Sequence, residues 1–170
     1  MRPSLLIVGA SVRAAVQSAD RAGLDCSGAD LFADLDAAAC ANVVRVTDYP
    51  RQFEKVAETA PHGPWMYTGG LENYPRLIDT IARTRLLWGN KPETSEQVRN
   101  PQTLSRELAR AGLPAVQISL DHKAVPRDGS WLKKPIRSCA GTGISHFTES
   151  FPSDKENCSE TKSVYYQRFI

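Results

Sequence analysis

The chain has 170 residues, of which 41% are hydrophobic and 24% are charged, and its formal net charge is +2 at pH 7. This length and composition are typical of a folded protein with a substantial core, and they exclude a disordered or fibrous chain. The near balance of charge excludes the strong positive field that gathers nucleic acid or anionic membranes, so any anion site must be local.

The amino terminus and the cysteines indicate where the protein resides and whether it holds zinc or disulfides. The apolar run at residues 5–10 is interrupted by Arg13, too early for a signal peptide or a membrane span. We therefore expect a cytoplasmic protein with no nucleic-acid partner and no membrane partner. Neither a zinc site nor a disulfide framework is predicted, because no histidine stands at metal-ligand spacing from the widely separated Cys26, Cys40, Cys139 and Cys158.

The first elements predict a strand, a glycine turn and a helix. Residues 4–8, SLLIV, read as a parallel strand that is buried on both faces. Ser11 is expected to cap the next helix, and Gly23 to follow its carboxyl end. The helix is predicted from its apolar stripe of Val12, Ala15, Val16 and Ala19.

Further strands are expected to end at residues 29–31 and to run over 42–46, which gives a Rossmann-like α/β fold with a parallel sheet. An acidic residue after the second strand, such as Asp34, could contact a nucleotide sugar. The turn after the first strand lacks the three glycines of the dinucleotide fingerprint, which disfavours NAD binding.

The next segment leads to a second pair of glycines. A helix is expected over 49–60, a short strand over 65–67, a helix from Pro75 and a strand over 86–88. Loops at the carboxyl edge of a parallel sheet commonly hold ligands. This places a candidate substrate site at Gly9, Ser11, Gly69, Gly70 and Asn73, although Asn73 is also explained as a cap of the helix that follows.

The sequence pattern changes near Gly89, which marks a domain boundary. The second half is predicted to contain both helices and short strands. A helix is predicted over 101–111, an extended segment over 116–120 and a polar linker over 121–130. Strands are expected over 131–136 and 165–170, with another at 144–147. The polar stretch 149–163 is expected to be a mobile surface excursion.

The most informative stretch is WLKKPIRSCAGTGI, residues 131–144. A strand can aim the Lys134 ammonium at one point, while Gly141 and Gly143 let backbone N–H groups approach an anion. A strand end with a solvated lysine explains the same residues. The pattern is not a P-loop, because the lysine precedes the glycines, and Cys139 inside it is most simply a bystander thiol.

The order of these elements, with GNKPETSEQVRNPQTLSRELARAGLPA in the middle and YYQRFI at the end, resembles the ATP-grasp superfamily. The resemblance covers nearly the whole chain. It implies a Rossmann-like preATP-grasp domain at 1–88, a helical A subdomain at 89–127, and lid strands, glycine loop and adenine hinge at 128–170. The second part would be an incomplete α+β ATP-grasp fold.

The resemblance also implies roles for particular residues. Lys134 matches the strand lysine that contacts nucleotide phosphates, and the loop with Ser138, Gly141, Thr142 and Gly143 matches the mobile loop that closes over them. The hinge would hold adenine through backbone groups, with the Gln167 side chain recognising its exocyclic amine. It comprises Gln167, Arg168, Phe169 and Ile170.

Two departures from the family pattern stand out. Asn100-Pro101 occupies the place of a second phosphate lysine, for which Arg99 could substitute. The chain also stops at Ile170, directly after the hinge, and so looks truncated. The Mg²⁺ ligands implied by the resemblance belong to the second half of the fold, so this chain alone is expected not to catalyse.

A full-length relative would be a ligase that uses ATP to convert a small-molecule carboxylate into an acylphosphate, which an amine or similar nucleophile then attacks. The alternative is a degenerate module that binds a nucleotide or a small acid without turnover. A Rossmann-type oxidoreductase is a third reading. Because an incomplete domain exposes an apolar edge at 165–170, we expect self-association or disorder there, and a homo-oligomer would follow.

Overall fold

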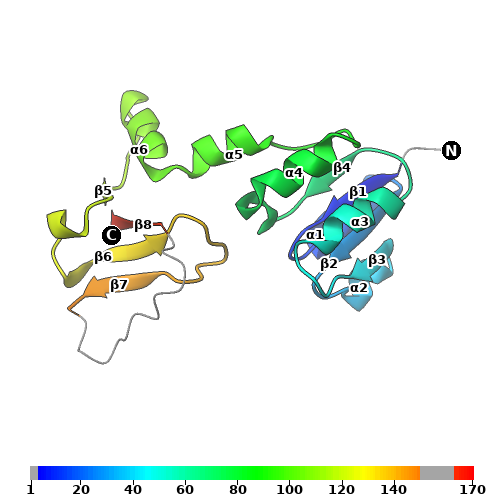
Figure 1. Ribbon diagram of the computed structural model, residues 1–170, viewed down its shortest axis with the longest axis horizontal. Helices are drawn as coiled ribbons and strands as arrows, with labels where there is room; N and C mark the ends of the chain where they lie inside the picture. Colours follow the sequence, from blue (N-terminus) through cyan, green and yellow to red (C-terminus); the bar gives the residue numbers. More distant parts are fainter. Residues whose placement is uncertain (1–3, 150–162) are drawn as a thin grey trace. The chain divides into compact units, whose positions relative to one another are not determined.

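The computed structural model describes residues 4–149 and 163–170, in two compact units. The first unit is Met1–Ser95 and the second is Glu96–Ile170, and helix α5 (Pro92–Arg99) spans their boundary (Figure 1). None of the described helices combines the length and the apolar character needed to cross a membrane.

The first unit is a four-stranded parallel sheet with helices on both faces, as the sequence predicted. The strand order is β3-β2-β1-β4 and every pairing is parallel. The strands are β1 (Leu5–Val8), β2 (Cys26–Asp30), β3 (Asn42–Arg45) and β4 (Trp65–Tyr67). The helical segments are α1 (Arg13–Arg21), α2 (Leu35–Ala38), α3 (Gln52–Thr59), η1 (Leu71–Asn73) and α4 (Pro75–Ala82).

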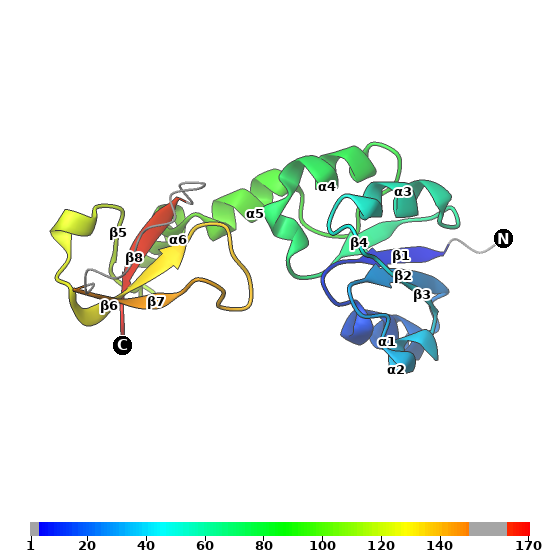
Figure 2. The same ribbon diagram turned by 60° about the horizontal axis from the view of Figure 1, so that its bottom comes forward.

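Burial on both faces explains why β1 is apolar throughout. Leu5 and Ile7 pack in one cluster with Val16 of α1, whereas Leu6 and Val8 pack in the other with residues of α3 and α4. Figure 2 shows α1 and α2 on one side of the sheet and α3 and α4 on the other. Successive side chains of a strand point to opposite faces, so a strand covered twice has no polar face.

Helix α1 ends as predicted but does not begin as predicted. Gly23 has φ 69°, and its N–H donates to Asp20 while the N–H of Leu24 donates to Ala19, which is a Schellman ending. The cap expected from Ser11 is wrong: the N-cap is Val12, and its N–H donates to the Asp30 carboxylate instead.

Two further local predictions in the first unit are wrong. Residues 86–88 form only an isolated parallel bridge, in which Leu87 lies beside Trp65 of β4. Asn73 does not cap α4, whose N-cap is Tyr74 without a side-chain hydrogen bond. The Asn73 side-chain amide instead donates to the carbonyl of Gly70, because the chain forms a 3₁₀ turn before α4 begins.

The second unit holds a four-stranded antiparallel sheet of order β5-β8-β6-β7, which confirms a second sheet after the parallel one. Val125, Trp131, Phe147 and Tyr166 form its small core. Its elements are α6 (Pro101–Arg110), β5 (Ile118–Ser119), η2 (His122–Ala124), β6 (Asp128–Pro135), β7 (Ser145–Thr148) and β8 (Val164–Arg168).

Strands β6 and β8 differ from expectation. β6 begins at Asp128 rather than Trp131, since Gly129 with φ 82° allows an irregular register before Leu132. β8 is not the edge strand that was expected, because it lies between β5 and β6, although Phe169 and Ile170 after it are exposed. The expected mobile excursion at 149–163 falls almost entirely on residues 150–162, which lie outside the described chain.

Candidate functional site

The second unit contains a cavity of about 420 Å³, between α6 and the sheet. This volume is within the range of pockets that bind small molecules. The lining contains two cations and no acidic side chain among the described residues. It comprises Val98, Arg99, Pro101, Leu104, Ser105, Leu108, Val116, Ile118, Lys134, Pro135, Ile136, Ser138, Cys139, Ala140, Gly141, Ile144, Tyr165 and Gln167.

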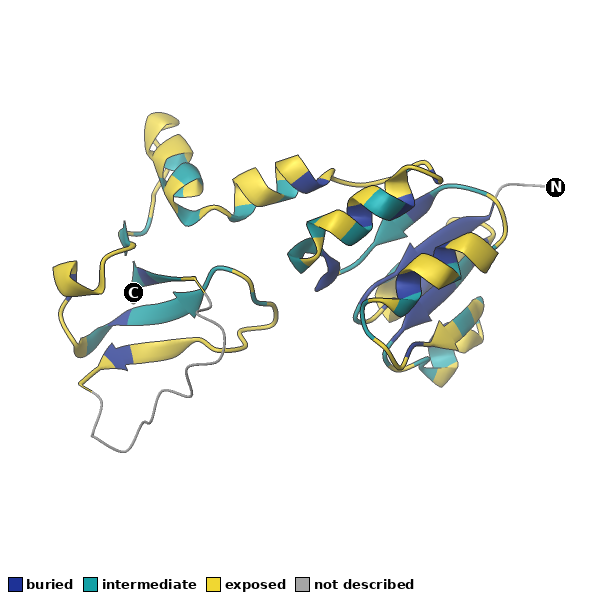
Figure 3. Ribbon diagram, viewed as in Figure 1, coloured by how far each residue is buried: buried dark blue, intermediate teal, exposed yellow. Residues whose placement is uncertain are grey.

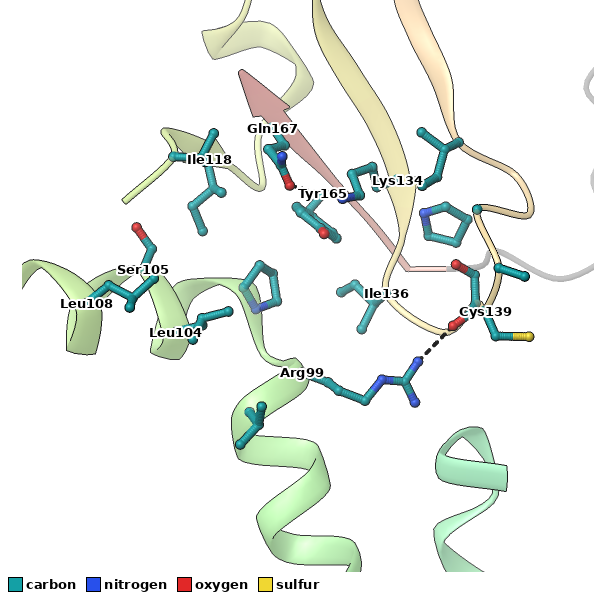
Figure 4. Close-up of a pocket in the computed structure, with 18 residues that line it drawn as sticks. Arg99, Leu104, Ser105, Leu108, Ile118, Lys134, Ile136, Cys139, Tyr165 and Gln167 are labelled. Atoms are coloured by element: carbon teal, nitrogen blue, oxygen red, sulfur yellow. Dashed lines mark hydrogen bonds between the residues drawn. The ribbon is translucent and has the colours of Figure 1, made fainter. Parts of the chain in front are cut away.

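Lys134 enters this cavity from β6. Its Nζ donates to Oε1 of Gln167 at 3.0 Å and lies 5.6 Å from the ring centroid of Tyr165 (Figure 4). The neighbouring Lys133 does not line the cavity, as expected from the alternation of side chains along a strand. The pairing of β6 with β8 therefore brings the ammonium to Gln167 inside the cavity, and no ion pair of Lys134 is found among the described residues.

The glycine loop follows directly after β6. Ala140 and Gly141 have φ 51° and 76°, and Gly143 has φ 76°. A Cβ on Gly143 would lie 3.0 Å from Cγ of Pro135, so both the backbone conformation and the space favour glycine there. Ser138 and Gly141 line the cavity, whereas Thr142 and Gly143 belong to the loop without lining it.

Arg99 connects the end of α5 to this loop. Its guanidinium donates to the carbonyl oxygen of Ser138 at 2.9 Å. Figure 4 shows Arg99 and Cys139 at one end of the cavity and Gln167 and Ile118 at the other. Arg99 therefore gives the end nearest the glycine loop a positive charge, while the Lys134 ammonium lies beside Gln167.

Asn100, which stands where a phosphate lysine was expected, caps α6. Its side chain accepts hydrogen bonds from the backbone N–H groups of Gln102 and Thr103, and Pro101 supplies the first helical residue. None of the residues of α6 is buried, and the helix is exposed or half-buried along its length (Figure 3). Leu104 and Leu108 on its apolar face form a wall of the cavity.

The hinge residues divide between the cavity and the surface. Gln167 lines the cavity, but Arg168, Phe169 and Ile170 do not. The N–H of Arg168 donates to Gln117, and the N–H of Phe169 donates to Ser130. The Phe169 ring packs edge-on against His146, with centroids 4.8 Å apart, so it is not positioned as a wall of this cavity.

The other five predicted residues gather in the first unit, at the carboxyl edge of its sheet. The Thr68 hydroxyl donates to the carbonyl of Ser11, and Ala10 donates to Gly69. A Cβ on Gly9 would lie 1.9 Å from Thr68 Oγ1, and one on Gly70 would lie 2.6 Å from the Tyr49 hydroxyl. The structure thus brings these glycines together with Asn73, and close packing also explains Gly9 and Gly70, whereas nothing lies within 4 Å of a Cβ on Gly69.

Asp30, at the end of β2, fills the position where a phosphate could meet the first turn of α1. The carboxylate is fully buried; Oδ2 accepts from the N–H of Val12 at 2.8 Å, and Oδ1 accepts from Phe32 and Ala33. The sequence alone did not indicate this role for Asp30, because an acidic residue at the end of a strand is also typical of contact with a nucleotide sugar. An internal carboxylate at the helix start leaves little reason to expect a dinucleotide there.

The chain matches no protein-family model and no curated protein. Its structure is similar to N5-carboxyaminoimidazole ribonucleotide synthetase from Thermotoga maritima, with a TM-score of 0.62 at 14% identity, over 99% of this chain and 46% of that one. It is also similar to carboxyaminoimidazole ribonucleotide synthase from Aspergillus clavatus complexed with ATP, with a TM-score of 0.67 at 13% identity, over 99% and 47%.

A third similar structure is L-amino acid ligase from Bacillus licheniformis, with a TM-score of 0.59 at 18% identity, over 99% of this chain and 44% of that one. The chain thus spans less than half the length of each of these proteins. The similarity extends across both sheets. The chain therefore has the fold of the N-terminal half of ATP-grasp enzymes, as the order of its motifs implied.

Proposed function

We propose that this chain binds ATP in the cavity of the second unit, as the nucleotide-binding part of an ATP-grasp ligase. The observation that carries the proposal is the Lys134 ammonium, which β6 holds inside a cavity closed at one end by Arg99 and the glycine loop. A structure with the same fold was determined in complex with ATP. The fold and the two cations of the cavity support the same ligand.

The described residues suit the parts of a nucleotide. The phosphates would meet Lys134 and Arg99, which supply positive charge in a cavity whose described lining has no acidic side chain. The glycine loop would cover them and keep water away. The base would lie along the apolar wall formed by Leu104, Leu108 and Ile118, with Gln167 at its edge.

The reaction proposed for the whole ligase is phosphorylation of a carboxylate, followed by attack of a nucleophile on the acylphosphate. The residues at Gly9, Ser11, Gly69, Gly70 and Asn73 are proposed to contact the carboxylate substrate. Mg²⁺ does not fit the described cavity, because its lining contains no carboxylate. Binding without turnover is accordingly the second proposal for the chain taken by itself.

Calorimetric titration of ATP into the full chain tests nucleotide binding. Lys134→Ala should weaken binding by at least about tenfold, since it removes a charge-assisted contact to phosphate. Lys133→Ala is the matched control, because this residue stands next in the same strand and does not line the cavity. Equal effects of the two substitutions, or no binding by the unsubstituted chain, would contradict the proposal.

A further inference from the structure

Gln167 is the hinge residue whose side chain faces the cavity. It lies in β8, opposite Ile118 of β5 and Leu132 of β6, so its backbone is held from both sides. Its amide lies at the end of the cavity away from Arg99 (Figure 4). A flat, apolar ligand group along Leu104 and Ile118 would therefore present its polar edge to this amide.

Backbone donors of the hinge contribute little to this end of the cavity. The N–H groups of Arg168 and Phe169 are already donated to the carbonyls of Gln117 and Ser130. Ile170 is 94% exposed and does not line the cavity. Recognition of the ligand edge thus falls mainly to the Gln167 side chain.

Lys134 fixes the orientation of that side chain. An ammonium has only donors, so the amide atom at 3.0 Å from Nζ must be the carbonyl oxygen Oε1. The other amide atom, Nε2, then remains as a donor. When Lys134 turns toward a phosphate, Oε1 is released as an acceptor, and the amide can rotate about its soft terminal torsion.

We propose that Gln167 lets the site accept 6-oxopurine nucleotides as well as 6-aminopurine nucleotides; this inference rests on the proposed nucleotide-binding function. A 6-amino group is a donor and pairs with Oε1. A 6-oxo group is an acceptor and pairs with Nε2. A neutral amide satisfies both, whereas an ionised carboxylate at this position would satisfy only the amino group.

The ring nitrogen beside the 6-position is consistent with this dual recognition. In a 6-oxopurine that nitrogen carries a proton, and a fixed N–H aimed at it would reject the base. The N–H groups of Arg168 and Phe169 are directed to carbonyls of the protein instead. The N–H groups of these two hinge residues therefore do not oppose the protonated ring.

The test is calorimetric titration of the full chain with ATP and with ITP, which differ at the 6-position and in protonation of the adjacent ring nitrogen. We expect dissociation constants within about tenfold of each other, because the 6-position of either base finds a hydrogen-bond partner in the Gln167 amide. Gln167→Glu at pH 8 should weaken ITP relative to ATP by about tenfold to a hundredfold, since two acceptors then face each other. The ratio cancels any effect of the new charge on Lys134 that both nucleotides share.

Gln167→Met serves as the second variant, because it removes both hydrogen-bonding groups at similar volume. It should weaken both nucleotides and keep their ratio within about tenfold. If the unsubstituted chain binds ATP but binds ITP more than a hundredfold more weakly, or if Gln167→Glu leaves the ratio unchanged, the dual recognition is wrong while nucleotide binding stands. If neither nucleotide binds, both proposals fail.

Discussion

The Arg99 guanidinium at the end of α5 donates to the carbonyl oxygen of Ser138, 39 residues further along the chain, at 2.9 Å. This contact holds the start of the glycine loop against the helix. The loop itself has two internal hydrogen bonds, from Thr142 to Cys139 and from Ile144 to Gly141. Arg99 thus gives the loop its connection to the helical part of the unit.

Substitution Arg99→Ala should loosen the loop even without nucleotide. The Ser138 carbonyl loses a charged donor, and the amides of Thr142 and Ile144 should exchange faster, by about tenfold for a contact of this kind. Hydrogen–deuterium exchange of a peptide covering 138–144 measures this. Arg106→Ala is the control, because Arg106 pairs on the surface with Glu107 of its own helix. Equal exchange in both variants would show that Arg99 does not hold the loop.

Gly9→Ala should destabilise the first unit by about 1–3 kcal/mol through overpacking. The new Cβ would lie 1.9 Å from Thr68 Oγ1. Gly69→Ala is the matched control, since nothing lies within 4 Å of a Cβ there. Native-state hydrogen exchange of the β1 amides measures the free energy of unfolding of the first unit alone. Adding Thr68→Ala to the Gly9→Ala chain should recover part of the lost stability. If the effects of the two substitutions on stability simply add, the contact with Thr68 is not the cause.

Asp30→Asn should cost about 2–4 kcal/mol, because one carboxylate oxygen that accepts backbone N–H groups is replaced by an amide donor. The affected partners are Val12, Phe32 and Ala33. Hydrogen exchange of the α1 amides at increasing urea concentrations gives the free energy of unfolding of the region around α1. Asp36→Asn, at an exposed pair with Arg13, should have a smaller effect. A larger loss at Asp36 would contradict the role given to Asp30.

The Ser130 hydroxyl, together with its backbone N–H, holds the pKa of the Asp128 carboxyl below its usual value. A carboxyl with a lowered pKa in the folded state contributes stability above its unfolded pKa of about 3.9, and loses it as pH falls through the folded value. Ser130→Ala should raise the Asp128 pKa toward its ordinary value. An NMR titration of the side-chain carboxyl carbon measures this, with Ser145→Ala as control; an unmoved titration would rule out the Ser130 contact.

Much of the fold follows from local patterns in the sequence. The continuous apolar run at residues 5–8 predicts a doubly covered strand, and the structure confirms it. Gly23 ends α1 as its position indicates. Such features depend on a few neighbouring residues, so they can be predicted without knowing the rest of the chain.

The features that were missed depend on residues distant in sequence. Asp30, rather than Ser11, supplies the acceptor at the start of α1 from a neighbouring strand. Residues 86–88 form a single bridge, through Trp65 of a strand far from them in sequence. At the candidate site, the Lys134 position was predictable from its strand, but its hydrogen bond to Gln167 arises from the pairing of β6 with β8. The apolar face of α6 was a local signal for the cavity wall.

The order β5-β8-β6-β7 places the strand that is last in sequence between two earlier ones. β5 and β6 have no direct pairing, so Ile118 and Lys134 reach the same cavity only after β8 has inserted between them. Pairing β8 with strands that are distant in sequence is slow compared with forming a local hairpin. The cavity should therefore appear late and all at once during folding, with β6 and β7 paired beforehand as a hairpin that cannot yet bind.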